Sequence, residues 1–313
     1  MGDPALPEPT RYLKPEALAR LKNLGLAARL VVEGLFAGQH KSPNRGFSIE
    51  FAEHRQYTPG IDPRHIDWKV LARRDKYYVK QYEEQTNLRC LLLLDASASM
   101  GYRDGGSMTK LEYACFCAAS LAYLMQVQHD AFGLITCRER MEHYMPARQG
   151  HGHLRMLLER LESLEPRGRT SLPRALHEVA ERLGRRALVV VLADLFSTDE
   201  GDGAKALIDA LSHLRHRKHE VVVLQMLDPS ELTFPFGDAT QIEDMETNDV
   251  ITADAEAVRR HYLESLDAYL GAIRSGCLSR GIGYALADTS EPFDRFLGAY
   301  LGRRHRLAMS RSA

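Results

Sequence analysis

The sequence predicts an α/β protein with a doubly wound, mostly parallel sheet of Rossmann-like type, preceded by an N-terminal helical and irregular module. Two observations predict this fold. From Leu88 onward, short apolar runs alternate with longer segments whose apolar residues recur at helical spacing. The run Ala187–Ala193 is apolar at every position, as expected of a central parallel strand covered by helices on both faces. Right-handed crossovers between such strands place helices on both sides of the sheet.

The composition agrees with a large folded chain. Its 313 residues are 44% hydrophobic, which is ample for a sizeable core. The 41 basic and 42 acidic residues nearly cancel, so there is no general reason to expect nucleic acid or an anionic membrane surface as a partner. We divide the chain into an N-terminal module, residues 1–87, and an α/β domain, residues 88–313.

Location is predicted from the cysteines and from the absence of apolar segments. The five cysteines show no paired C-x-x-C spacing, and several lie in apolar patterns, so we expect them to be reduced core residues of a cytoplasmic protein. No apolar run approaches the roughly 20 residues that a membrane span needs. The first fourteen residues lack the pattern of a secretory signal.

The N-terminal module contains two kinds of sequence. Pro15–Gly38 has leucines at mostly helical spacing, which predicts one or two amphipathic helices. Residues 40–87 are rich in charged and aromatic residues and contain several prolines, which predicts loops and short strands. Lys76–Tyr82 is the best strand candidate there because of its aromatic and β-branched content.

The α/β domain follows as alternating elements, with Met141–Met145 close enough to Ala131–Cys137 to be its antiparallel neighbour. The expected strands are Leu88–Leu94, Ala131–Cys137, Met141–Met145, Ala187–Ala193 and Glu220–Leu227. The expected helices are Lys110–His129, His153–Leu164, Ser171–Leu183 and Ala204–Arg215, and a last helix and strand lie within Asp254–Ala287.

A D-x-S-x-S sequence directly follows the first of these strands. Asp95, Ser97 and Ser99 are spaced two apart, so an extended turn points one carboxylate and two hydroxyls the same way. Three hard oxygens of this kind suit a divalent cation such as Mg²⁺. The loop cannot fill an octahedral shell alone, so further ligands are expected from neighbouring loops.

Two other loops supply candidates. Asp194 directly follows Ala187–Ala193 and reaches the same edge of the sheet as Asp95 if the two strands are parallel neighbours. Gly168 permits an unusual turn before Thr170, whose hydroxyl offers another oxygen ahead of a helix. The competing interpretation is that these Asp, Ser and Thr side chains only cap helices.

The residues Asp95, Ser97, Ser99, Thr170 and Asp194 resemble the ligand set of a metal-ion-dependent adhesion site. The order of strands and helices from Leu88 onward is similar to a von Willebrand factor type A domain. This resemblance implies Mg²⁺, with Mn²⁺ as a substitute, and one coordination position open to the carboxylate of a partner protein.

A second resemblance lies in residues 50–84. This stretch is similar to the bacterial family called domain of unknown function 58, in which a von Willebrand type A domain follows. The matching residues are Glu50, Phe51, Glu53, Arg55, Gln56, Tyr57, Pro59, Gly60, Asp62, Arg64, Ile66–Lys69, Ala72, Arg73 and Tyr78–Glu84. Ile61 and Gln85 depart from the family pattern, which usually has acidic residues at both positions. The resemblance implies a MoxR-type AAA+ ATPase as partner and a role in the assembly or maturation of protein complexes.

The same stretch has the composition of a charge-paired structure. Its acidic and basic residues nearly balance, so Arg55, Arg64 or Arg73 could pair with carboxylates, and Trp68 is expected to anchor the network. The catalytic alternative is a nuclease-like arrangement of Asp62 with Asp67–Lys69, for which no third acidic ligand has a convincing place.

Histidines offer a zinc alternative. His213, His216 and His219 are near one another in sequence, as are His151 and His153. The first three lie among basic residues at a predicted helix C-terminus, which favours a solvated helix end. Cys115 and Cys117 face away from each other on a helix, so they are expected in the core.

The functional prediction is a non-enzymatic protein-binding module that recognises its partner through a bound metal. The alternative is a metal-dependent hydrolase or nuclease that uses Asp95 and Asp194 as ligands. No obvious His or Glu general base accompanies the metal loops, and the sequence contains no G-x-S-x-G elbow, P-loop or G-x-G-x-x-G motif.

Overall fold

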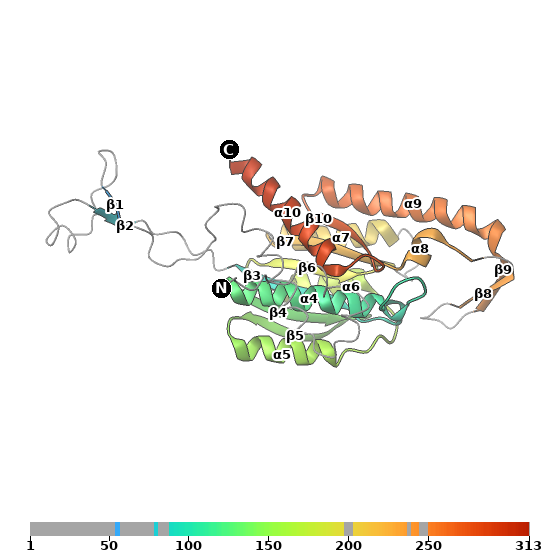
Figure 1. Ribbon diagram of the computed structural model, residues 1–313, viewed down its shortest axis with the longest axis horizontal. Coiled ribbons are helices and arrows are strands. Elements are labelled where there is room, and N and C mark those ends of the chain that lie inside the picture. The colour runs from blue at the N-terminus through green and yellow to red at the C-terminus, as the bar shows by residue number, and fades with distance from the viewer. Residues whose placement is uncertain are drawn as a thin grey trace, which may run out of the picture. The chain divides into compact units, whose positions relative to one another are not determined.

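The main unit is built on a six-stranded sheet in the order β10-β7-β6-β3-β4-β5 (Figure 1). The computed structural model describes residues 54–56, 78–80, 88–196, 203–236, 239–243 and 250–312. The strands are β3 (Arg89–Asp95), β4 (Ala131–Cys137), β5 (Met141–Arg148), β6 (Leu188–Ala193), β7 (Glu220–Leu227) and β10 (Gly283–Asp288). All neighbouring pairs are parallel except β4 and the edge strand β5.

The alternation of side chains along β3 explains why the sheet needs helices on both faces. Leu92 and Leu94 point into one hydrophobic core, whereas Leu91 and Leu93 point into the other. All four are almost completely buried. A strand that is apolar on both faces must be covered on both, which confirms the expected fold class.

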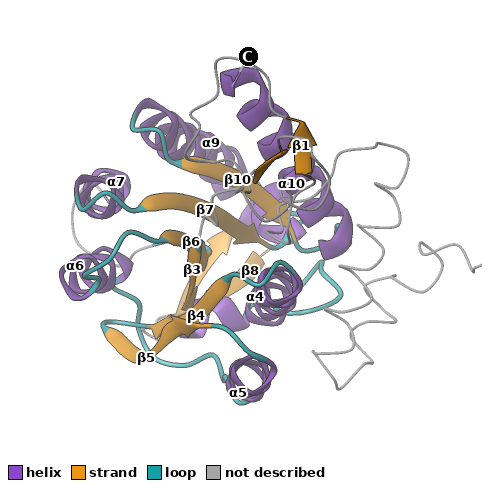
Figure 2. Cartoon of the chain, turned by 90° about the vertical axis from the view of Figure 1, so that its left-hand side faces the viewer, coloured by secondary structure: helices purple, strands orange, loops and turns teal. Residues whose placement is uncertain are grey.

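Among the described residues, three helices lie on each face of the sheet (Figure 2). The helices on one face are α4 (Lys110–Val127), α5 (His151–Glu162) and α10 (Phe293–Ser312). The helices on the other are α6 (Leu172–Arg182), α7 (Gly203–His216) and α9 (Ala255–Ser279). The Phe116 and Phe293 rings stack at 5.0 Å and join α4 to α10.

Most elements lie where the sequence predicts them. The strands β4 and β7 have the predicted bounds, and β5 is the expected antiparallel neighbour, although it continues to Arg148. The sequence analysis missed the short helix α8 (Pro229–Thr233), the hairpin of β8 (Ala239–Glu243) and β9 (Val250–Asp254), and α10. Among the α10 side chains that the structure describes, Phe293, Phe296 and Leu297 are buried, and Tyr300 and Leu301 pack against the same core. Their helical spacing was a signal for α10 that the sequence analysis did not use.

A second compact unit spans Ser42–Asn87. In it β1 (His54–Gln56) pairs antiparallel with β2 (Tyr78–Lys80), which lies inside the strand predicted at Lys76–Tyr82. The predicted helices of 15–38, the charge pairs of Arg64 and Arg73, the anchor Trp68 and the nuclease-like Asp62 and Asp67 lie outside the described residues. The division at residue 87 stays a prediction.

The cysteines agree with expectation. All five are free and buried. Burial raises the pKa of Cys115 to about 12, which keeps this thiol protonated and unreactive. Within the described ranges, none of the helices combines the length and apolar character needed to cross a lipid bilayer.

Candidate functional site

Four aspartates mark the carboxyl ends of four adjacent parallel strands. They are Asp288 on β10, Asp228 after β7, Asp194 after β6 and Asp95 at the end of β3. Asp95, Asp194 and Asp228 are fully buried. Buried carboxylates need hydrogen bonds or cations, so their partners define the site.

Asp95 is the centre of the predicted ligand set. Its Oδ1 accepts a hydrogen bond from the Ser97 backbone N–H at 2.9 Å, and its Oδ2 accepts one from the Thr170 hydroxyl at 2.9 Å. The hydroxyls of Ser97 and Ser99 lie 3.1 Å apart. Asp95, Ser97, Ser99 and Thr170 are therefore brought together from two loops that are more than seventy residues apart in the sequence.

Backbone hydrogen bonds fix the two loops to each other. The Ala98 N–H donates to the Gly168 carbonyl at 2.9 Å, and the Arg167 N–H donates to the Ala96 carbonyl at 3.1 Å. Gly168 has φ of 74°, a conformation that favours glycine. The Arg138 side chain also donates to the Ala96 carbonyl at 2.8 Å. These contacts hold the Thr170 hydroxyl against Asp95.

The helix-cap interpretation fails for the two serine N-caps of these loops. Ser97 precedes a short 3₁₀ helix, Ala98–Gly101, and Ser171 precedes α6, yet neither side chain makes a cap hydrogen bond. Thr109 does cap α4 and forms a reciprocal capping box with Glu112. The Ser97 and Thr170 hydroxyls instead bond within the candidate site.

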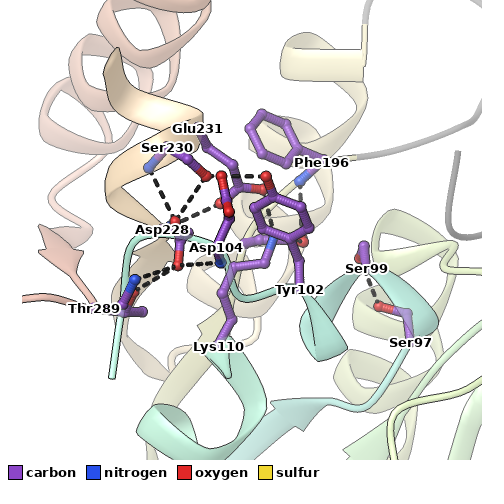
Figure 3. A network of polar contacts seen from close by, with 12 residues as sticks. Ser97, Ser99, Tyr102, Asp104, Lys110, Phe196, Asp228, Ser230, Glu231 and Thr289 are labelled. Carbon is purple, nitrogen blue, oxygen red and sulfur yellow. Dashed lines mark hydrogen bonds and ion pairs between the residues drawn. The ribbon is translucent and has the colours of Figure 1, made fainter. Parts of the chain in front are cut away.

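Asp194 directly follows β6, the strand beside β3, and its carboxylate is held by a lysine. Its Oδ1 accepts the Phe196 N–H at 3.2 Å, and its Oδ2 accepts a hydrogen bond from Lys110 Nζ at 2.8 Å. The same ammonium contacts Glu231 Oε1 at 2.7 Å. Figure 3 shows the Lys110 side chain extending toward Tyr102 and Glu231. The sequence analysis did not predict Lys110 or Glu231.

Burial and charge set the protonation of the site. Burial raises the pKa of Asp95 to about 7, the negative charge of Asp194 adds to this, and the hydrogen bonds from Ser97 and Thr170 oppose it. Burial by itself lowers the pKa of Lys110, but Asp194 and Glu231 raise it above its ordinary value. Lys110 is therefore a charged ammonium at neutral pH, with 1% of its side chain exposed.

Asp228 positions the loop that leads to Lys110 (Figure 3). Its Oδ1 accepts the Gly105 N–H at 2.9 Å, and its Oδ2 accepts the Gly106 N–H at 3.0 Å. The Ser230 N–H and hydroxyl donate to Oδ1 at 2.9 and 2.8 Å, and Tyr102 contacts the Ser230 hydroxyl. The sequence analysis did not single out Asp228; the sequence pattern that could have indicated it is its capping box with Glu231 at the start of α8.

The oxygen atoms gathered at this edge are of the kind that a hard cation prefers. The assembled groups are two carboxylates and three hydroxyls, all oxygen donors, and they fit Mg²⁺ or Mn²⁺ better than zinc. No group of three or more His, Cys, Asp or Glu residues in the described ranges is arranged to hold a metal ion. A metal ion at this edge of the sheet would therefore need the hydroxyls as ligands.

Two histidines of the zinc alternative, His213 and His153, contact other groups. His213 Nε2 lies 3.1 Å from Glu181 Oε1, and its Nδ1 lies 3.0 Å from His177 Nδ1. His219 is buried, whereas His216 is exposed. His153 is buried beside the Phe132 carbonyl at 2.8 Å. Cys115 and Cys117 both lie in the core, as expected.

A family model described as "Protein of unknown function DUF58" matches residues 53–268. The chain belongs to this family. Two relatives are "Uncharacterized protein Mb1516" of Mycobacterium bovis and "Uncharacterized protein Rv1480" of Mycobacterium tuberculosis, each 26% identical over 264 residues. Each comparison covers 81% of this chain and 77% of the relative. The DUF58 match covers residues 53–84 of the charged stretch and all strands of the main sheet except β10.

Two solved structures are similar to this DUF58 protein at low sequence identity. The hypothetical protein BatB from Bacteroides thetaiotaomicron is 18% identical with a TM-score of 0.46, covering 70% of this chain and 99% of that one. The SpRpn10 VWA domain is 12% identical with a TM-score of 0.41, covering 67% of this chain and 93% of that one.

Proposed function

We propose that this DUF58 protein is a non-enzymatic protein-binding module that recognises a partner through a divalent metal ion. Asp95, Ser97, Ser99, Thr170 and Asp194 would hold Mg²⁺, or Mn²⁺ in its place. The observation that supports this most is the convergence of the Thr170 and Ser97 groups on the Asp95 carboxylate, beside Asp194. A bound ion would supply a positive centre to which a partner's Asp or Glu binds.

The side-chain hydrogen bonds favour binding over catalysis. A hydrolase would need a general base that activates water or a hydroxyl nucleophile. The Ser97 hydroxyl contacts the Ser99 hydroxyl, and the Thr170 hydroxyl donates to Asp95, so in this proposal both hydroxyls act as ligands and not as nucleophiles. Phosphatase and nuclease assays with Mg²⁺ and Mn²⁺ should give no turnover. Turnover that Asp95→Ala abolishes would establish the hydrolase instead.

The proposed partner is a MoxR-type AAA+ ATPase, with a role in assembly or maturation of protein complexes in the cytoplasm. This part rests on the family resemblance of residues 50–84. The proposed metal site makes this partnership testable, because a contact between the partner's carboxylate and the metal is lost when the ion is removed.

The test is capture of the purified MoxR-type ATPase of the same organism by the immobilised chain, with Mg²⁺ and with EDTA. We expect capture in Mg²⁺ and loss of capture in EDTA or with Asp194→Ala. Asp288→Asn is the matched control, since it removes a carboxylate from the same edge of the sheet, on the more distant strand β10. Equal capture with and without EDTA would refute metal-mediated recognition.

A further inference from the structure

Lys110 is a buried cation that is already in contact with a proposed metal ligand. Its Nζ lies 2.8 Å from Asp194 Oδ2 and 2.7 Å from Glu231 Oε1, so one ammonium is shared by two carboxylates. The other oxygen of Asp194 accepts the Phe196 N–H at 3.2 Å. Both oxygens of Asp194 are thus engaged within the chain.

The surroundings of Lys110 restrict where the ammonium can go. Lys110 is the first residue of α4, after the Thr109 cap, and its side chain is 1% exposed. The rings of Tyr102 and Phe196 lie 5.8 and 5.6 Å from Nζ. Moving toward Glu231 keeps the charge paired, whereas leaving this enclosure would strand both carboxylates without a cation.

Electrostatics link this ammonium to metal binding. A positive charge in contact with a ligand carboxylate repels an arriving divalent cation and neutralises the carboxylate that would attract it. At the effective dielectric of a protein, charges a few ångströms apart interact strongly enough to change an affinity about tenfold or more. Glu231 has the opposite effect, because it offers the ammonium a second partner.

We propose that Lys110 is the internal counter-cation of the metal site and that Glu231 is its alternative acceptor. Without a divalent ion, Lys110 neutralises Asp194. When the ion binds, Asp194 turns to the metal, and the ammonium stays paired with Glu231. Lys110 therefore weakens metal binding and Glu231 strengthens it. This inference rests on the proposed metal site and concerns how tightly that site holds its ion.

A purely structural role for Lys110 predicts a different result. As a salt bridge that only joins α4 to the end of β6 and to α8, it would stabilise the site, so its loss would weaken metal binding or leave it unchanged. The loss of Glu231 would do the same. The exchange mechanism instead predicts opposite signs for the two substitutions.

The experiment is calorimetric titration of Mg²⁺, and separately of Mn²⁺, into the wild type, Lys110→Met, Glu231→Gln and Asp95→Ala. We expect Lys110→Met to bind Mg²⁺ about tenfold or more tightly and Glu231→Gln to bind it about fivefold or more weakly. Arg103→Met is the matched control, because it removes an exposed positive charge from the same loop and should change affinity by less than about twofold. Circular dichroism checks that each variant is folded.

A second arm covers a poorly folded Lys110→Met. Lys110→Met leaves both Asp194 and Glu231 without their cation, whereas the double variant Lys110→Met/Glu231→Gln leaves only Asp194 without it. The double variant should bind Mg²⁺ more tightly than Glu231→Gln alone. Tight binding by the lysine variants with no measurable binding by the wild type would also support the proposal.

Two failures are distinguishable. Wild-type binding that Asp95→Ala abolishes, together with unchanged or weaker binding by Lys110→Met, would overturn the role of Lys110 and leave the metal site standing. Absence of binding by the wild type, Lys110→Met and the double variant would overturn the metal site itself.

Discussion

Replacement of Asp228 by Asn tests how the loop before α4 is held. The carboxylate accepts four hydrogen bonds of 3.0 Å or less, from the Gly105 and Gly106 N–H groups and from the N–H and hydroxyl of Ser230. Weaker contacts come from Asp104 and Thr289, at 3.3 and 3.4 Å. In the Asp228→Asn variant the remaining side-chain oxygen can keep the three short bonds of Oδ1, while the new amide group faces the Gly106 donor.

The magnitude follows from these contacts. Hydrogen bonds to a charged group contribute about 1.5–3 kcal/mol each, and a buried donor left unpaired costs about 1–3 kcal/mol. We expect Asp228→Asn to lower the free energy of unfolding by about 2–4 kcal/mol. Burial opposes the charged form of Asp228, but its many donors hold the pKa of this carboxyl below the ordinary value. Its contribution is therefore present above about pH 4 and lost as the pH falls through the lowered pKa.

The assay is urea unfolding followed by circular dichroism at neutral pH and at pH 3. Asp228→Asn should lower the urea midpoint without changing the slope, and its difference from the wild type should shrink at the lower pH. Asp288→Asn is the control, because the Asp288 carboxylate accepts exposed hydrogen bonds from the Ser290 N–H and hydroxyl, and the substitution should cost about 1 kcal/mol or less. Equal midpoints for Asp228→Asn and the wild type would refute the anchoring of this loop by Asp228.

Three further predictions concern the same edge of the sheet. In EDTA, Asp95 keeps a proton in the folded state between about pH 4 and 7, whereas the unfolded chain has lost it, so the free energy of unfolding should fall by about 1 kcal/mol per pH unit as the pH rises through this range. Asp95→Asn should lack this pH dependence in thermal unfolding. A pH dependence equal to that of the wild type would contradict the raised pKa of Asp95. Gly106→Ala would place a Cβ 2.5 Å from Thr289 Oγ1 and should lower the free energy of unfolding by about 1–3 kcal/mol. A second substitution, Thr289→Ala, should recover part of this stability. Gly184→Ala is the control, because its Cβ would meet nothing within 4 Å and should leave the urea midpoint unchanged. Thr170→Val should lower the free energy of unfolding by about 1–3 kcal/mol because Asp95 Oδ2 loses the Thr170 donor, and it should weaken Mn²⁺ binding. Thr170→Ser should retain the stability and the Mn²⁺ affinity of the wild type. A Thr170→Val variant that behaves like the wild type would exclude the hydroxyl from the site.

The sheet was predictable because its signals are local. A strand such as β7 is apolar over nearly its whole length, and its flanking helices have apolar residues at helical spacing. The shared edge of Asp95 and Asp194 followed from one further rule, that parallel strands end at the same edge, and it depended on β3 and β6 being neighbours, as the structure shows. The hairpin of β8 and β9 carries no such long apolar run, and it was missed.

The electrostatic partners of the site were not predictable in the same way. Lys110 meets Asp194 across 84 residues and Glu231 across 121, and nothing in the sequence near Lys110 distinguishes it from a solvated lysine at the start of a helix. The capping boxes at Thr109 and Asp228 were local signals, but they predict helix starts and not an ion pair. Only the packing of α4 and α8 at the carboxyl ends of the strands brings these charges together.

The most direct test of the metal site is a titration of Mn²⁺ into the wild-type chain, monitored by the electron paramagnetic resonance signal of the free ion. The wild type should remove one Mn²⁺ per chain from the free pool, excess Mg²⁺ should return it, and Asp95→Ala should remove none. Equal depletion of the free signal by the wild type and Asp95→Ala, or no depletion by either the wild type or Lys110→Met, would show that these oxygens do not form a metal site.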